Sequence, residues 1–401
     1  MIAMKKIKVL LVISFISLFT TGCWNYNELN DLAITTGIAV DIKDNQYVVS
    51  YMIANAKKSQ GESQSQEANS VVFSGQGESI SSAYQDLNSK VSKIPYISHL
   101  EVLIISEEAA KKGVINIVDF LMRNPESRKE FFVILSKGST AISILETLSP
   151  LDPFPSQSIA NNILSNQTTQ SSVIVEEFSE FISKLLQQGI NPILSGIEIE
   201  GNAEEGKNQS SLENSKPSAV TKISSIGIFK NDILLGWAEK EESIGINILR
   251  NKVDSVLLQA KCDNHHMAAT LTNIQTNTEI NFNNNNPQLK ITVDAQGALV
   301  EINCKKNLED TNVIEELSSE FENSLKNLLS NSISLAATQY KSDIFGYGNM
   351  IYKNNLTKWN QIKDLWEEEL FPQIDYEIKT NISLSSKGSF EQTILEAKNE
   401  K

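Results

Sequence analysis

The residues that most often carry out chemistry in proteins are sparse in this chain. Cysteine and histidine, the usual nucleophiles, bases and metal ligands, contribute three residues each: Cys23, Cys262, Cys304, His99, His265 and His266. The cysteines are too few and too scattered for a four-thiolate zinc site or a disulfide-rich scaffold. His99 follows Ser98 directly, but adjacency in sequence does not set geometry, and we expect an interior or capping histidine. His265 and His266 would point apart in an extended segment and so would not share a metal.

Sequence motifs for nucleotide binding or nucleophile activation are also missing. There is no Gly-x-Ser-x-Gly, no His-Glu-x-x-His and no P-loop in the 401 residues. Gly75-Gln76-Gly77-Glu78 is half of a dinucleotide-binding fingerprint, and without a third glycine a helix-entry turn explains it better. Glu367-Glu368-Glu369 is most simply a solvated helical face. The sequence therefore predicts no catalytic, cofactor-binding or metal-ligating residue, and a protein that is not an enzyme.

Cys23 is the residue for which the sequence predicts a covalent modification. Three lysines precede an apolar run over residues 9–19, which is typical of a signal peptide. Eleven helical residues reach only about 16 Å, too short for an ordinary bilayer span. Thr20-Thr21-Gly22-Cys23 is similar to a bacterial lipobox, with Thr20 where leucine is usual. It predicts removal of residues 1–22 and attachment of diacylglycerol and N-acyl groups to Cys23; a simple secretory signal with a spare thiol is the alternative.

The charge of the chain excludes some partners. The sequence has 35 Lys and Arg against 49 Asp and Glu, a net charge of −14. Removing residues 1–22 takes away three lysines and no acid, which leaves −17 on the exported part. Such a body is repelled by nucleic-acid phosphates and by anionic headgroups. We expect no nucleic-acid partner and a body that stands off the bilayer on its lipid, with Trp24 either at the membrane interface or packed on the first domain.

Hydrophobic periodicity predicts alternating helices and strands in the first half of the mature chain. A polar stretch at 57–70 has no large apolar side chain and is expected to be a mobile loop. The predicted elements are a hairpin at 32–53, strands at 71–74, 100–105 and 130–135, and helices at 79–91, 107–112, 115–122, 156–164 and 175–188. The strand at 100–105 is almost continuously apolar, which favours a strand covered on both faces.

The second half shows a different pattern. The predicted elements are a hairpin at 223–238, strands at 253–260, 267–271, 279–282, 289–302 and 374–384, a long amphipathic helix at 313–339 and a shorter one at 356–366. We therefore predict a multi-domain α+β and α/β protein: a mixed α/β domain at 23–199, a polar linker at 200–218, and a domain at 219–390. In the last of these an antiparallel sheet packs against the long helix.

For two features of the second domain, the sequence leaves two interpretations open. Cys262 and Cys304 follow separate predicted strands, and they are either joined as a disulfide or buried as free thiols. The segment at 342–348 contains Phe345 and Tyr347, each followed by a glycine. It either presents these rings to a partner or forms a tight turn whose aromatic side chains belong to the core.

The sequence after Gly22 resembles a known family. Cys23-Trp24 with Glu28 shortly after resembles the opening of the Ger(x)C lipoproteins, the C subunits of spore nutrient germinant receptors, with Asn25 where that family has Asp. Segments similar to the family's N-terminal domain are 98–100, 107–113 and 119–128. Segments similar to its C-terminal domain are 227–232, 236–237, 241–243, 342–348 and 359–372.

The resemblance implies an α/β body held by its lipid on the outer face of the spore inner membrane. It implies two integral-membrane partners, an A subunit and a permease-like B subunit, and a non-enzymatic role in receptor assembly or signalling during germination. It implies no cofactor. The alternative is a substrate-binding lipoprotein of an importer, which should show two similar lobes around a cleft. The two halves predicted here differ from each other.

Overall fold

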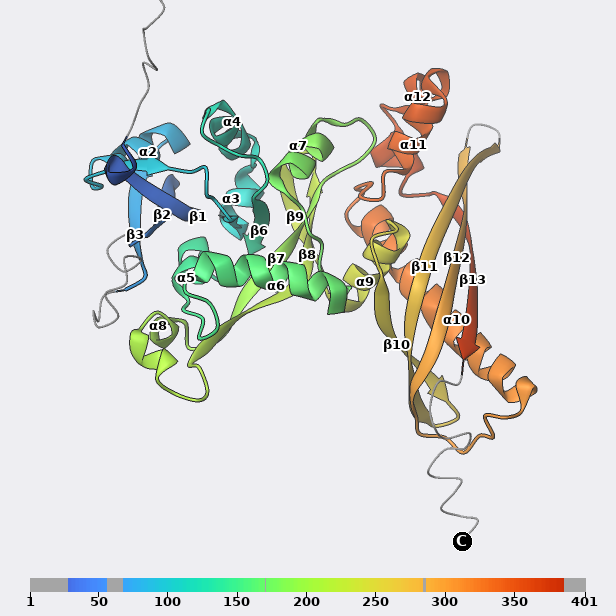
Figure 1. Cartoon of the computed structure of the whole chain (residues 1–401). Helices are drawn as coiled ribbons and strands as arrows, with labels where there is room; N and C mark the ends of the chain where they lie inside the picture. Colours follow the sequence, from blue (N-terminus) through green and yellow to red (C-terminus); the bar gives the residue numbers. More distant parts are fainter. Residues whose placement is uncertain (1–27, 56–67, 170, 284–285, 386–401) are drawn as a thin grey trace, which may run out of the picture.

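The computed structural model describes residues 28–55, 68–169, 171–283 and 286–385, and within these ranges the strands form two sheets (Figure 1). The expected signal segment at 1–22, the lipid site Cys23, Trp24 and most of the loop at 57–70 lie outside the described residues. Mixed helices and strands in more than one sheet confirm the predicted fold class. No helix within the described ranges has the length and hydropathy needed to cross a membrane.

The first sheet holds nine of the described strands. Its spatial order is β3 (Ser70–Gly77), β2 (Gln46–Ala54), β1 (Leu32–Lys43), β5 (Val102–Ser106), β6 (Phe132–Ser136), β7 (Ile193–Gly201), β8 (Ala219–Lys230) and β9 (Ile233–Ala238), with β4 (Ile94–Tyr96) beside β1. The central strands β1, β5, β6 and β7 are parallel, whereas both flanks are antiparallel. The hairpin predicted at 32–53 is therefore confirmed as β1 and β2.

Helices cover both faces of this sheet. One face carries α2 (Ile80–Asn88), α3 (Glu107–Lys112), α4 (Ile115–Arg123) and α7 (Phe178–Leu186), and the other carries α5 (Ala141–Glu146) and α6 (Pro155–Thr169). Alternate residues of β5 serve the two faces, because Leu103 and Ile105 pack with the first group while Val102 and Ile104 pack with the second. This confirms the strand predicted to be buried on both faces.

The second sheet is covered by a helix on one face. Its order is β10 (Ser255–Cys262), β11 (His265–Asn283), β12 (Asn286–Ile302) and β13 (Asp375–Ser385). The helix α10 (Thr311–Ser334), continued by η4 (Leu335–Gln339), buries Leu317, Phe321 and Leu325 against the sheet, which confirms the predicted amphipathic helix. Along β12, Lys290, Asp294 and Gln296 are exposed on the opposite face. Because α10 returns the chain to the starting end of β12, β13 pairs parallel to it, unlike the other pairs.

Three elements differ from the sequence-based expectation. Residues 200–218 contain α8 (Ala203–Gly206) and η3 (Gln209–Leu212) and connect two paired strands of the first sheet, so the change of sheet comes later, at α9 (Lys240–Leu249). The helix α9 was not predicted, because residues 243–249 are all buried and show no polar face. The two short strands expected within 265–283 form one strand, β11, interrupted by an irregularity beside Asn273.

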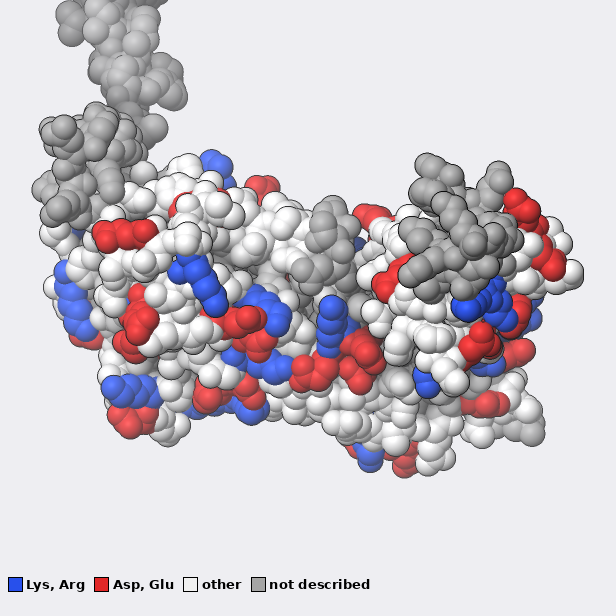
Figure 2. Space-filling view, turned by 90° about the horizontal axis from the view of Figure 1, so that it is seen from below, with Lys and Arg blue, Asp and Glu red and all other residues white. Residues whose placement is uncertain are grey.

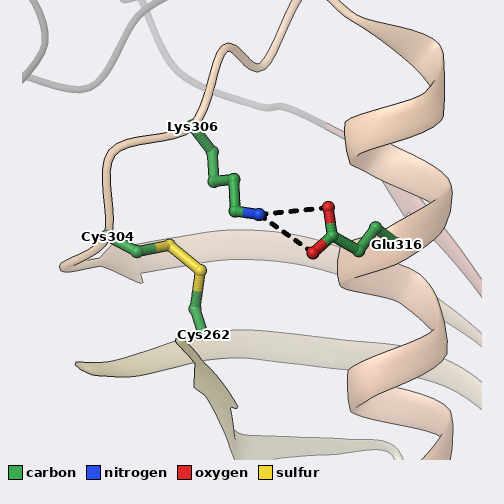
Figure 3. The surroundings of a disulfide bond; sticks show 4 residues. All are labelled: Cys262, Cys304, Lys306 and Glu316. Carbon is green, nitrogen blue, oxygen red and sulfur yellow. Dashed lines mark hydrogen bonds and ion pairs between the residues drawn. A yellow bond between two sulfur atoms is a disulfide. The ribbon is translucent and has the colours of Figure 1, made fainter. Parts of the chain in front are cut away.

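The lower end of the second sheet in Figure 1 is closed by a covalent bond. Cys262 ends β10, and it is joined by a disulfide to Cys304, which follows β12 (Figure 3). Next to the disulfide, Lys306 Nζ lies 2.9 Å from Glu316 Oε1, so the loop after β12 is also paired to α10. The structure thus selects the disulfide from the two interpretations that the sequence leaves open.

Candidate functional site

The segment that follows α10 joins the two sheets. Ser342 Oγ donates a hydrogen bond to the carbonyl oxygen of Phe229 at the end of β8. The hydroxyl of Tyr340 pairs with both the N–H and the carbonyl oxygen of Trp237 in β9, each at 3.0 Å. The peptide N–H of Asn191 donates to the carbonyl oxygen of Asp343 at 2.8 Å. We call this contact region the junction, and it is formed by residues 187–191, 229–237 and 340–371.

Asp343 is the centre of the junction. Its carboxylate Oδ1 accepts hydrogen bonds from the peptide N–H groups of Phe345, Gly346 and Tyr347, at 3.2, 2.8 and 3.2 Å. Its Oδ2 accepts from the N–H of Gly348 at 2.7 Å and from the indole N–H of Trp366 at 3.0 Å. The chain can wrap around the carboxylate because Gly346 has φ +82°, a conformation that favours glycine.

Burial raises the pKa of Asp343 to about 6. Loss of solvent around the carboxylate is the largest cause, and the hydrogen bonds from Gly348, Gly346, Trp366 and Tyr347 oppose it by favouring the ionised form. Because all five donors already serve this one side chain, the carboxylate is committed to holding the turn together rather than to binding a substrate.

Backbone contact at the junction requires glycine on both sides. A Cβ atom at Gly189, where φ is +71°, would lie 2.4 Å from the carbonyl carbon of Gly348. A Cβ atom at Gly348 would lie 2.7 Å from Nε1 of Trp366. Gln188 is held from both sides, because its carbonyl oxygen accepts from the side-chain amide of Asn349 at 2.8 Å and its Oε1 accepts from the indole N–H of Trp359 at 2.9 Å.

Aromatic side chains fill the interior of the junction. Tyr347 is 2% exposed and packs against Phe345 and Phe371, with ring centroids 5.2 and 6.5 Å apart. Trp366 packs against Phe371 and Trp359, at 5.9 and 6.1 Å. The interpretation that Tyr347 anchors a partner is therefore wrong, and the alternative, a turn with a core aromatic, is confirmed.

Charged groups also cross the junction. Glu367, in η5 (Trp366–Leu370), accepts a hydrogen bond from the side-chain amide of Asn191, and burial raises its pKa. Lys230 pairs with Glu368 at 2.5 Å and lies 3.8 Å from Glu367. The prediction of a solvated face at 367–369 is thus wrong for Glu367.

A second buried group of charges lies outside the junction. The carboxylate of Glu176 is 3% exposed and pairs with Lys184 and Arg250, and burial lowers the pKa of Lys184 to about 8.

A surface hollow lies away from the junction, between α2 and α4. It is an open pocket of about 690 Å³, and its wall includes Tyr84, Asp119, Phe120 and Arg123. The half fingerprint at 75–78 leads into α2, where Cβ atoms at Gly75 and Gly77 would collide with the helix backbone and Ser79 caps its first turn. This confirms the helix-entry turn, since the glycines serve close packing.

The histidines do not assemble into a site. His99 is exposed beside the ring of Tyr96, at 6.1 Å between centroids, so it is not the interior histidine that was one of the two expectations. His265 and His266 are both exposed at the start of β11. Among the described residues, no three His, Cys, Asp or Glu side chains are grouped so that they could hold a metal ion.

The structure brings together motifs that are far apart in the sequence. Residues 227–232, 342–348 and 359–372, each noted from its likeness to one family, meet at the junction. Asp232 also lies at the end of the segment at 107–113, because its backbone carbonyl oxygen accepts a hydrogen bond from the N–H of the next residue, Val114, at 3.0 Å. Gln188 and Asn191 were not predicted, and the only signal near them was the end of the helix predicted at 175–188.

Comparison with known proteins agrees with this organisation. Residues 25–199 match the family described as spore germination protein N-terminal domain, and residues 224–388 match the family described as spore germination B3/GerAC like, C-terminal. The chain belongs to the Ger(x)C family, the C-subunit family of spore germination receptors. Both family domains occur here in the same order as the predicted motifs.

Relatives of the family resemble the chain over nearly its full length. Spore germination protein KC of Bacillus subtilis (strain 168) is 25% identical over 389 residues, which cover 95% of this chain and 95% of that protein. Spore germination protein B3 of the same organism is 20% identical over 94% of this chain and 97% of its own length. The crystal structure of the GerBC protein has a similar fold, with a TM-score of 0.54 and 16% identity over 90% of this chain and 99% of that one.

Proposed function

We propose that this protein is a lipid-anchored, non-enzymatic subunit of a spore nutrient germinant receptor. In this proposal residues 1–22 are removed, Cys23 carries the lipid, and the body lies on the outer face of the spore inner membrane beside integral-membrane A and B subunits. The observation that carries the proposal is the match of both Ger(x)C domains across nearly the whole chain.

The junction supports a structural role for the polar groups that sequence motifs mark. The carboxylate of Asp343 is fully occupied by five donors. Glu367 binds Asn191, and Glu368 binds Lys230, across the two sheets. Such groups hold two domains in a fixed relation, as a subunit of an assembly requires.

The anchor is tested by fractionation of spore membranes together with mass analysis of the N-terminal peptide. The wild-type chain is expected in the inner-membrane fraction with an acylated Cys23, and two multi-span proteins are expected to co-purify with it after detergent extraction. Cys23→Ala should abolish maturation or membrane association. The matched control, Cys262→Ser with Cys304→Ser, removes the other two cysteines and should leave the protein in the membrane. An unmodified Cys23 in the wild-type chain would contradict the proposal.

The importer alternative is separated by ligand binding. A substrate-binding lipoprotein is stabilised strongly by its own free ligand, because the ligand binds only the folded state. We expect no large increase in Tm when the purified protein is screened with amino acids and sugars. A large increase with one of them would favour the importer subunit over the receptor subunit.

A further inference from the structure

One projecting part of this acidic protein has the opposite charge. Residues 344–363 contain three lysines, Lys353, Lys358 and Lys363, and no Asp or Glu, although the chain as a whole has 49 acids and 35 basic residues. This stretch includes α11 (Tyr347–Asn354) and α12 (Leu356–Ile362), which form a helical hairpin at the upper right of Figure 1. We call residues 352–365 the tip.

Apolar side chains of the tip are exposed beside these lysines. Every residue from Tyr352 to Thr357 is exposed, and Leu356 and Leu365 are 54% and 45% exposed. The inward side is fixed, because Ile351, Trp359 and Ile362 are buried in the core of the second domain. Lysines interspersed with exposed Leu and Tyr on a firmly packed helical support are typical of surfaces that lie on a membrane.

The tip contains one acid, Asp364, which is exposed beside Lys363. Of the glutamates that follow the tip in sequence, Glu367 and Glu368 are bound by Asn191 and Lys230 at the junction, whereas Glu369 is exposed. Lys358 Nζ lies 4.8 Å from the ring centroid of Phe282, an exposed residue at the end of β11, which places another ring at the same corner. On the opposite face of the molecule, seen from below in Figure 2, blue and red residues are interspersed. With three lysines against one acid, the tip carries a net charge of +2 in a chain whose net charge is −14.

The tip lies on the same side of the molecule as the start of the described chain. Figure 1 shows η1 (Leu29–Asp31), α4, α7 and α12 along the upper side, and α8 along the lower side. Cys23 precedes Leu29 by six residues, so covalent geometry limits the distance between their Cα atoms to roughly 20 Å. A lipid on Cys23 would hold this side close to the bilayer.

We propose that the tip is a second membrane contact, which rests on an anionic bilayer through its lysines and inserts Leu356 and Tyr352 at the interface. This inference rests on the lipid anchor proposed above. Three lysines alone would give a protein without an anchor only weak affinity for an anionic bilayer. On an anchored protein, however, the contact is intramolecular, so a weak site is sufficient to set the orientation of the body. The tip would then hold the second domain against the membrane, at the opposite end of the molecule from the anchor.

The test uses the full chain, processed and lipidated in a bacterial host and inserted into vesicles. Leu356→Cys provides a free thiol for a fluorophore, because Cys262 and Cys304 are bonded to each other. Its fluorescence should be quenched by spin-labelled lipid in vesicles of phosphatidylcholine with phosphatidylglycerol, and much less in phosphatidylcholine alone. The control is Leu151→Cys, because Leu151 is 90% exposed. Three residues before it, the N–H of Leu148 donates to the carbonyl oxygen of Gly206 at the end of α8, so this position belongs to the lower side of the molecule. It should stay unquenched.

Replacing each tip lysine by glutamine should lower the ratio of docked to undocked protein about fivefold, the factor that corresponds to about 1 kcal/mol per lysine. Flotation with the vesicles reports the anchor separately. A chain that does not float would overturn the anchor, whereas a chain that floats with an unquenched label at residue 356 would overturn only the second contact. Quenching that appears only when integral-membrane subunits are present would assign the tip to a protein surface and also overturn the proposal.

Discussion

The two ends of the second domain are held by different kinds of bond. At the upper end the junction consists of a buried carboxylate, its five donors and a group of aromatic rings. At the lower end a disulfide joins the ends of two strands, and an ion pair fixes the following loop. The upper end connects two domains, whereas the lower end closes a single one.

This difference determines which conditions each end responds to. The junction depends on the fit of buried side chains and on the protonation of Asp343, so packing mutations and pH act on it. The lower end depends on the oxidation state of two thiols, so reductants act there.

The largest effect is expected for Trp366→Ala at the junction. Trp366 is 1% exposed, and its loss removes ring contacts and one donor to a buried carboxylate. We expect the free energy of unfolding to fall by about 5 kcal/mol, measured by urea denaturation. The matched control is Tyr347→Phe in the same cluster, because the Tyr347 hydroxyl has no hydrogen-bond partner among the described residues. That variant should be as stable as the wild type or more so; a similar loss in both variants would contradict the role given to the indole donor.

The next largest effect is expected for Cys304→Ser at the lower end. The disulfide spans 42 residues of sequence, and closing a loop of this length in the unfolded chain stabilises the folded state by about 4 kcal/mol. The wild-type protein should lose this amount in reductant, and the variant should show no further loss when reductant is added. If reductant destabilised the variant as well, the effect could not be assigned to this bond.

The elements of the fold with a clear hydrophobic period could be predicted from the sequence. The apolar run of β5 indicated a strand buried on both faces, and the apolar positions of α10 at every third or fourth residue indicated its length. The helix α9 could not be predicted, because it lies buried between other elements and lacks a polar face. Its sequence therefore has no period to detect.

The candidate site was predictable only in part. The glycines of 342–348 indicated a turn, because glycine adopts backbone conformations that other residues avoid. Whether its rings face a partner or the core depends on which segments pack against it, and that information lies in residues 187–191 and 229–237. Gln188 and Asn191 are ordinary polar residues at a turn, so no local pattern distinguishes them before the two domains are placed together.

A smaller effect, which depends on pH, is expected at Asp343. Its pKa in the folded protein is raised from 3.8 to about 6, so between these values the folded chain binds more protons than the unfolded chain. The contribution of Asp343 to stability is therefore complete only well below its unfolded pKa of 3.8, and it is lost as the pH rises through 6. Subtracting the free energy of unfolding of Asp343→Asn from that of the wild type should give a difference that decreases by about 2 kcal/mol between pH 4 and pH 7.

Asp119→Asn is the control for this measurement. Asp119 is exposed on α4, and its hydrogen bond from Arg123 lowers its pKa, so any slope that it causes has the opposite sign. Both variants are compared with the wild type by urea denaturation at the two pH values. A difference for Asp343→Asn that stays constant or increases would mean that the five donors outweigh burial and keep the carboxylate ionised throughout. The junction would then be independent of pH, like the disulfide end, and the two ends of the domain would differ only in their response to reductant.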